Sequence, residues 1–246
     1  MIHLKSFFAA TVFEAIRNAH PVTLIVATLM ATGVQSTQAG TIALNATVQG
    51  WFRSNGSHID TNTNYIVGQY VVSGAPLGLI NDFFAFDIPP IASIMSASLV
   101  VYNPSSGYAS GNPSETVVLH DVSTPISTLA AYSPSESPTG RAVYNDLGSG
   151  VVFASQTVSA ADNNSNVAFS LNDAAIASLI ASLGQPWAIG GTISPITLPA
   201  AQNETVFTYS TGGPVQLILQ TVPEPSTLVL AAFGFFALAC WLRNRR

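Results

Sequence analysis

The amino-acid sequence predicts an all-β fold with one short helix, arranged as a jelly-roll-like antiparallel β-sandwich and followed by a C-terminal transmembrane helix. Between residues 40 and 222, apolar residues mostly alternate with polar ones, which is the period of a half-buried strand. Turn residues interrupt this pattern every ~8–12 residues, as in sandwiches and barrels. The strand-like runs follow one another without helices between them, which argues against a parallel βαβ arrangement.

The alternating runs predict nine to eleven short strands. They fall within 41–52 (a strand pair or one bent strand), 65–72, 81–88, 93–103, 115–122, 151–158, 166–171, 186–193, 204–210 and 215–221. The stretch from residue 123 to 150 is expected to be loop, because Pro125, Pro134 and Pro138 interrupt it.

One segment changes period and predicts the helix. Its apolar residues at i, i+3, i+4 and i+7 are Ile176, Leu179, Ile180 and Leu183. Asn172 or Asp173 is suited to cap the first turn, and Gly184 is suited to the C′ position.

The charge distribution excludes nucleic acid as a partner. Residues 40–222 hold two basic residues, Arg53 and Arg141, against ten acidic ones, so this region repels phosphate backbones. The single cysteine, Cys240, lies outside this region, which therefore has no internal disulfide. A stretch of about 180 residues is long enough to be held by an ordinary apolar core.

Residues 1–39 have the order of features of a secretory signal peptide. Lys5 and Arg17 precede an apolar stretch at 22–34, and small residues at 37–39 predict cleavage by signal peptidase after Ala39. The alternative is an uncleaved membrane anchor, but about 13 apolar residues are short for a span.

No catalytic signature is present between the two ends. The G-x-S-x-G, H-E-x-x-H and P-loop patterns are absent from the sequence. The acidic residues there are too scattered to nominate a glycosidase pair: Asp82, Asp87, Glu115, Asp121 and Asp146. The protein is therefore expected not to be an enzyme, no residue is assigned as catalytic, and a glycan-active enzyme ranks lowest among the alternatives.

Two histidines have a carboxylate nearby. His58 and Asp60 lie two residues apart, so an extended backbone places both on one face, where the carboxylate orients the imidazole. His120 and Asp121 are adjacent and point to opposite faces. A polar loop and a strand end, respectively, are the favoured interpretations.

One turn resembles the oxygen ligands of a calcium loop. Asp162, Asn164 and Asn166 alternate, and Asp173 follows eleven residues after Asp162, but Val167 occupies the place where an EF-hand needs glycine. A surface turn is favoured, with a structural calcium ion as the alternative. No other metal and no cofactor is expected.

The aromatic residues have two interpretations. The set comprises Trp51, Phe52, Tyr65, Tyr70, Tyr102, Tyr108, Tyr132 and Tyr144. Aromatic side chains in alternating strands are usually core. Exposed rings also stack on the apolar faces of sugars, and Tyr102, Tyr108 and Tyr132 are the loop-side candidates for such a ligand-binding face.

The C-terminal segment predicts a membrane anchor. Residues 226–242, about 17 in number, carry no charge, which is the short end for a transmembrane helix. Arg243, Arg245 and Arg246 then act as a topology stop that keeps this end in the cytoplasm.

The last residues, "VPEPSTLVLAAFGFFALACWLRNRR", resemble the PEP-CTERM sorting signal. The resemblance implies that Pro223, Glu224 and Pro225 form the recognition element for an exosortase, a membrane cysteine protease of Gram-negative bacteria that make exopolysaccharide. Three regions follow: a signal peptide (1–39), an extracytoplasmic β-sandwich (40–222) and a sorting signal (223–246).

Stretches of the middle region, such as "FFAFDIPPIASIMSASLVVYNPSSGY", also resemble a β-rich module that precedes such tails and has no assigned activity. The sequence therefore predicts an exported, non-catalytic protein, anchored in the inner membrane before processing and then placed at the cell surface or in the exopolysaccharide matrix. The alternative is a carbohydrate-binding module for the producer's own exopolysaccharide.

Overall fold

The structure is a computed structural model that describes residues 40–91, 93–208 and 215–221, all within one compact unit, Ala39–Val222. The strands are β1 Gly40–Asn45, β2 Val48–Arg53, β3 Val67–Val72, β4 Ala75–Asp87, β5 Ile94–Asn103, β6 Ala109–Ser110, β7 Glu115–Asp121, β8 Val152–Val158, β9 Ser165–Ser170, β10 Pro186–Ile193, β11 Glu204–Val206 and β12 Gln216–Thr221. The helices are α3 Ile126–Leu129, α4 Pro138–Leu147, α5 Asp173–Ala181 and the 3₁₀ turn η1 Ala160–Asp162.

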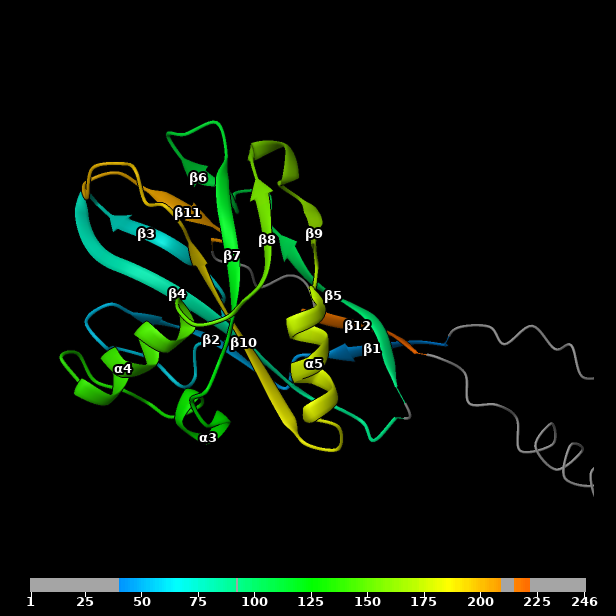
Figure 1. Ribbon diagram of the computed structural model, residues 1–246. Helices are drawn as coiled ribbons and strands as arrows, with labels where there is room; N and C mark the ends of the chain where they lie inside the picture. The colour runs from blue at the N-terminus through cyan, green and yellow to red at the C-terminus, as the bar shows by residue number, and fades with distance from the viewer. Residues whose placement is uncertain (1–39, 92, 209–214, 222–246) are drawn as a thin grey trace, which may run out of the picture. The chain divides into compact units, whose positions relative to one another are not determined.

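The strands form two antiparallel sheets, so the prediction of a mostly β, antiparallel fold is confirmed. The smaller sheet has the order β1-β12-β5-β9. The larger sheet has the order β6-β11-β3-β4-β10-β7-β8, with β2 also paired to β4, and it curls into a half-barrel (Figure 1). The long β4 makes this possible, because β3 pairs with its first half while β2 and β10 flank its second half.

The main core lies between the two sheets. Phe84 and Phe86 of β4 meet Leu99 of β5 and Leu219 of β12 in one cluster of buried side chains. A second cluster lies on the other face of β4, beneath α3 and α4, and comprises Phe52, Phe83, Ala85, Leu129, Val143, Leu147 and Ala188. Because both faces of β4 are covered, its sequence "FFAF" is continuously apolar instead of alternating.

Helix α4 corrects the prediction that residues 123–150 are loop, and with α3 it corrects the prediction of one helix. Ser137 caps α4 by accepting a hydrogen bond from the Gly140 amide at 3.1 Å. Pro138 then occupies the first helical position, where its missing N–H leaves no hydrogen bond unmade. A proline expected to interrupt structure therefore begins a helix, and Val143 and Leu147 are buried on its inner face.

The helix predicted around residue 176 is confirmed as α5. Its N-cap is Asn172, whose side-chain oxygen accepts from the Ala175 amide at 3.1 Å. Leu179 is buried in the main core, whereas Ile180 is 45% exposed, so the packed face is narrower than the apolar pattern suggests. Gly184 has a φ of +74° and lies two residues beyond the C-cap.

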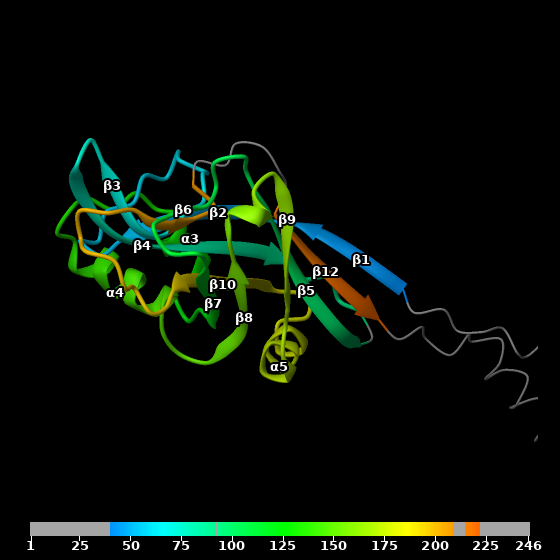
Figure 2. The same cartoon turned by 90° about the horizontal axis from the view of Figure 1, so that it is seen from above.

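The two ends of the unit lie side by side. Strand β1 pairs antiparallel with β12 from Gly40 opposite Thr221 to Asn45 opposite Gln216, as Figures 1 and 2 show. Strand β12 lies between β1 and β5, so the last strand of the unit is interior to its sheet. Within the described ranges, no helix is long and apolar enough to span a membrane. The predicted spans and sorting residues lie outside those ranges.

Candidate functional site

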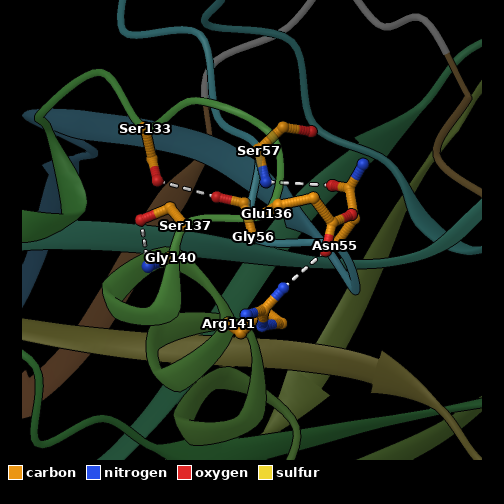
Figure 3. A network of polar contacts seen from close by, with 8 residues as sticks. All are labelled: Asn55, Gly56, Ser57, Ser133, Glu136, Ser137, Gly140 and Arg141. Atoms are coloured by element: carbon orange, nitrogen blue, oxygen red, sulfur yellow. Dashed lines mark hydrogen bonds and ion pairs between the residues drawn. The ribbon is translucent and has the colours of Figure 1, made fainter.

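The loop that follows β2 is held against the segment that precedes α4 (Figure 3). The Ser133 hydroxyl donates to the Gly56 carbonyl at 2.7 Å. The Glu136 amide donates to the Asn55 carbonyl at 2.8 Å. These contacts join two segments that lie far apart in the sequence into one polar framework.

The first turn of α4 completes this framework. A Cβ atom on Gly140 would lie 1.9 Å from the Gly56 carbonyl oxygen, so only glycine allows so close an approach. Arg141 forms an ion pair with Glu136 at 2.6 Å beside it. The loop after β2 is therefore fixed by α4 and does not depend on its own sequence alone.

His58 lies in this framework as a buried, oriented imidazole. Its amide and carbonyl pair with Ser133, its ring stacks on Phe52 with centroids 4.4 Å apart, and it is 3% exposed. Nδ1 lies 2.8 Å from the Trp51 carbonyl oxygen, so Nδ1 carries the proton and Nε2 keeps a lone pair. Burial lowers the pKa of His58, against the opposing effects of the Trp51 carbonyl and Asp60.

His58 and Asp60 line one cleft of about 580 Å³. Its other lining residues come from the β1–β2 connection and from neighbouring loops: Asn45, Ala46, Thr47, Val48, Gln49, Thr63, Ala130 and Val215. A volume of this size falls within the range of small-molecule sites, ~300–1,000 Å³. His58 and Asp60 therefore line the same cavity, but the imidazole is oriented by the Trp51 carbonyl, not by the Asp60 carboxylate as the alternative interpretation of the sequence expected.

The three candidate tyrosines do not form one face. Tyr102 donates to the Asn164 side chain at 2.6 Å, and the amide of Tyr108 donates to the Asn163 side chain at 2.8 Å, so both contact the same turn. Tyr132 is 63% exposed and follows α3. Figure 1 shows β6, next to Tyr108, and α3 at opposite ends of the view. Their role in ligand binding stays a prediction.

The other aromatic residues mostly belong to the core. Trp51, Phe52 and Tyr65 are each less than 9% exposed. Burial raises the pKa of the half-buried Tyr144, which packs against the cluster beneath α4. For these residues the structure favours the core interpretation over a sugar-binding platform.

The calcium-like turn uses its oxygens within the protein. Asp162 accepts hydrogen bonds from the Ser159 amide at 2.8 Å and the Ser159 hydroxyl at 3.1 Å, and Asn164 accepts from Tyr102. Asp173 lies in the first turn of α5. Among the residues that the structure describes, His, Cys, Asp and Glu form no group of three or more that is placed to hold a metal ion. The structural calcium ion stays a prediction.

One close carboxylate pair was missed by the sequence analysis. Glu115 of β7 and Glu204 of β11 interact, and burial, partly offset by hydrogen bonds from Ser110 and Asn112, raises the pKa of Glu115. Glu204 accepts from the Thr197 amide at 2.9 Å. The exposed fractions of Glu115 and Glu204 are 4% and 0%, and neither lines the cleft. No local pattern signals a pair that lies so far apart in the sequence.

Three of the acidic residues that the sequence analysis considered too scattered to form a glycosidase pair have separate surroundings. Asp146 accepts hydrogen bonds from the hydroxyls and amides of Ser123 and Thr124. Burial alone would raise the pKa of Asp146, but these hydrogen bonds outweigh it, so the pKa is lowered. Asp121 accepts from the Val151 amide, and Asp87 is exposed at the end of β4.

Two buried ionisable side chains have buried polar atoms without a hydrogen-bond partner. Both carboxylate oxygens of Asp82 are buried and unpaired, and burial raises its pKa to about 7. A Cβ atom on Gly191 would lie 2.3 Å from an Asp82 oxygen, so the carboxyl group lies over that glycine. His120 is buried with Nδ1 unpaired, and burial lowers its pKa. Neither residue lines the cleft.

Comparison with known proteins gives a family match at the C-terminal end of the chain. No curated protein matches the chain. The family model for the PEP-CTERM protein-sorting motif matches residues 221–246, beginning at the last residue of β12. Pro223, Glu224, Pro225 and the three terminal arginines all fall within the matched range. The chain thus carries a PEP-CTERM protein-sorting motif at its C-terminus, which implies an exported, surface-sorted protein that is processed by an exosortase.

Proposed function

We propose that residues 40–221 form a non-catalytic module that is displayed at the cell surface or in the exopolysaccharide matrix after the sorting signal is processed. The observation that carries this proposal is the junction at β12: the motif begins at Thr221, which pairs with Gly40 in the first strand. Both segments to be removed therefore join the unit at one place, and processing leaves its two sheets whole.

The absence of catalysis is part of the proposal. Glu115 and Glu204 are both buried, and Glu204 accepts a hydrogen bond from the Leu198 amide. Neither residue lines the cleft. A glycosidase needs both carboxylates at the surface of a substrate cleft. This placement supports a display role over hydrolysis.

Export and sorting are tested by comparing the full chain with a chain that ends at Thr221. Cells of an exopolysaccharide-producing host are separated into cytoplasm, inner membrane, surface and medium, and each fraction is blotted. The full chain should pass from the inner membrane to the surface, whereas the shortened chain should be exported without membrane retention. Replacing Pro223, Glu224 and Pro225 by alanine should leave the full chain in the inner membrane. If both forms stay in the cytoplasm, the proposal fails.

Carbohydrate binding is the second candidate. The polar cleft beside His58 favours it, because its size and lining suit a small polar ligand such as a sugar unit. The exposed ring of Tyr132 is a separate surface on which a sugar can stack. The jelly-roll-like fold predicted from the sequence supports carbohydrate binding only by analogy with other proteins of that fold. Affinity electrophoresis in gels that contain the host's matrix polysaccharide, with and without calcium, tests it. Unchanged mobility in every gel would remove this candidate and leave the display role standing.

A further inference from the structure

The imidazole of His58 presents an unused acceptor to the cleft. Because Nδ1 donates to the Trp51 carbonyl, Nε2 is the unprotonated nitrogen, and no described residue is hydrogen-bonded to it. His58 is 3% exposed, yet it lines the cleft. A neutral imidazole that donates through one nitrogen accepts through the other, so Nε2 is the acceptor that His58 offers to a ligand.

The neighbouring side chains add further acceptors. The side-chain nitrogen of Gln49 donates a hydrogen bond to the Thr63 carbonyl at 2.7 Å, which leaves the side-chain oxygen as an acceptor for a ligand. Asn45 uses its oxygen to accept from Gln216 at 3.0 Å, which leaves its amide nitrogen as a donor. Together with the exposed Asp60 carboxylate, the lining offers mainly acceptors.

The charges around the cleft disfavour an anion. Both basic residues of 40–222 are engaged elsewhere: Arg53 lies over the Trp51 ring at 5.2 Å, and Arg141 is paired with Glu136. A carboxylate or phosphate ligand would thus face Asp60 without a countercharge. A cation would gain little from one exposed carboxylate, because solvent screens the attraction. Hydroxyl groups fit best, because each donates to an acceptor and still accepts from the donor.

We propose that the cleft formed by His58, Asp60 and Gln49 binds one uncharged, hydroxyl-rich ring, such as a sugar unit of a neutral polysaccharide. The inference rests on the carbohydrate-binding candidate above and assigns it a site and a ligand class. The Asp60 carboxylate accepts from two neighbouring hydroxyls, and the His58 and Gln49 acceptors fix the remaining edge of the ring.

The test uses the full chain, purified in detergent, on an array of neutral, uronic-acid, amino-sugar and sulfated glycans. Wild-type protein should bind neutral glycans and leave the acidic ones unbound. Asp60→Asn should weaken that binding about tenfold, since it removes a charged acceptor. Gln49→Ala should weaken it as well. Asp60 is exposed, so its variant should fold normally, and circular dichroism checks this for each protein. Asp87→Asn changes an exposed carboxylate outside the cleft and is the matched control.

The outcomes separate the site from the function. Neutral-glycan binding that survives in Asp60→Asn and Gln49→Ala overturns the cleft. Loss of that binding in Tyr102→Ala or Tyr108→Ala, which remove the ring, would then keep carbohydrate binding at another face. Binding to amino sugars or uronic acids alone overturns the ligand class. Binding to no glycan overturns both, and the display role is judged separately by fractionation.

Discussion

Asp82 is a buried carboxylic acid in β4, within the larger sheet. Neither of its oxygens has a hydrogen-bond partner, and it lies between Gly191 of β10 and Trp51 of β2 in the larger sheet. Burial of a carboxylate without a partner favours the protonated form. The folded state therefore binds this proton more tightly than the unfolded chain does.

The first prediction concerns the pH dependence of stability. With a folded pKa of about 7 against an ordinary value of 3.8, Asp82 favours folding at low pH, and this contribution is lost as pH rises toward and through 7. Asp82→Asn should therefore be more stable than wild type at pH 8, by roughly 2–4 kcal/mol, and nearly equal to it at pH 4. Urea unfolding at both pH values measures this.

The comparison of variant with wild type isolates Asp82 from the other titrating groups. His58 and His120 have lowered pKa values and act with the opposite sign, because their neutral forms are favoured in the fold. Their effect is common to both proteins and cancels. An Asp82→Asn variant with the same pH profile as wild type would show that the carboxyl group has a partner at high pH.

A second prediction concerns the paired glycines of β10. A Cβ atom on Gly190 would lie 2.5 Å from the Leu147 carbonyl oxygen at the end of α4. Gly190→Ala should therefore push α4 from the sheet and cost about 1–3 kcal/mol. Gly111→Ala, whose new Cβ would lie 3.4 Å from its nearest neighbour, is the control. Thermal unfolding of both variants decides it, and equal melting temperatures would contradict the packing described for α4.

Among the elements, α4 connects the fold to the cleft. Its inner face covers the second cluster of buried side chains. The segment that precedes it is hydrogen-bonded to the loop that carries His58, and Gly140 of its first turn lies against the Gly56 carbonyl of that loop. Loss of the α4 cap should therefore weaken both the helix and the framework around the cleft.

Ser137→Ala tests this at the level of the helix. Removing the hydroxyl leaves the Gly140 amide without its acceptor, and the expected cost is about 1 kcal/mol of unfolding free energy. Ser135→Ala, at an exposed neighbouring position, should change the free energy little. Chemical denaturation of the two variants measures the difference. A cost at Ser135 equal to that at Ser137 would argue against the cap.

The strands and α5 were predictable because their signals are local. The strand pattern predicted β10 at its observed bounds, and the apolar period from Ile176 to Leu183 predicted α5, with Asn172 or Asp173 as its cap. Helix α4 was missed because Pro138 has opposite meanings inside a helix and at its first position. Only the N-cap Ser137 before Pro138 distinguishes a proline that begins a helix from one that interrupts it.

The cleft was predictable only in part. The sequence suggested His58 and Asp60 as a pair on one face of extended backbone, but a polar loop was the favoured interpretation. Their cavity also needs Ala130 and Val215, which tertiary pairing brings to them from distant segments. The same limit applies to the buried pair of Glu115 and Glu204, since sequence spacing carries no information about contacts between strands that are distant along the chain.

For the whole molecule, the order of strands predicts how truncations behave. A chain that ends at Thr221 keeps both sheets and should unfold at the same temperature as the full chain in the same detergent. A chain that ends at Val215 lacks β12, so β1 loses its partner and Leu217 and Leu219 leave the core. That chain should fail to fold, as measured by proteolysis and circular dichroism. A protease-resistant unit ending at Val215 would show that β12 is dispensable.

The interior position of β12 also links folding of the smaller sheet to the presence of the sorting motif. The smaller sheet is complete only when residues 216–221 are present, and the sorting motif begins at the last of these residues. A chain that stops before residue 216 therefore lacks both β12 and the sorting motif. Loss of the sorting signal is then coupled to loss of a complete sheet, so we expect an unsorted chain of this kind to be sensitive to proteases as well.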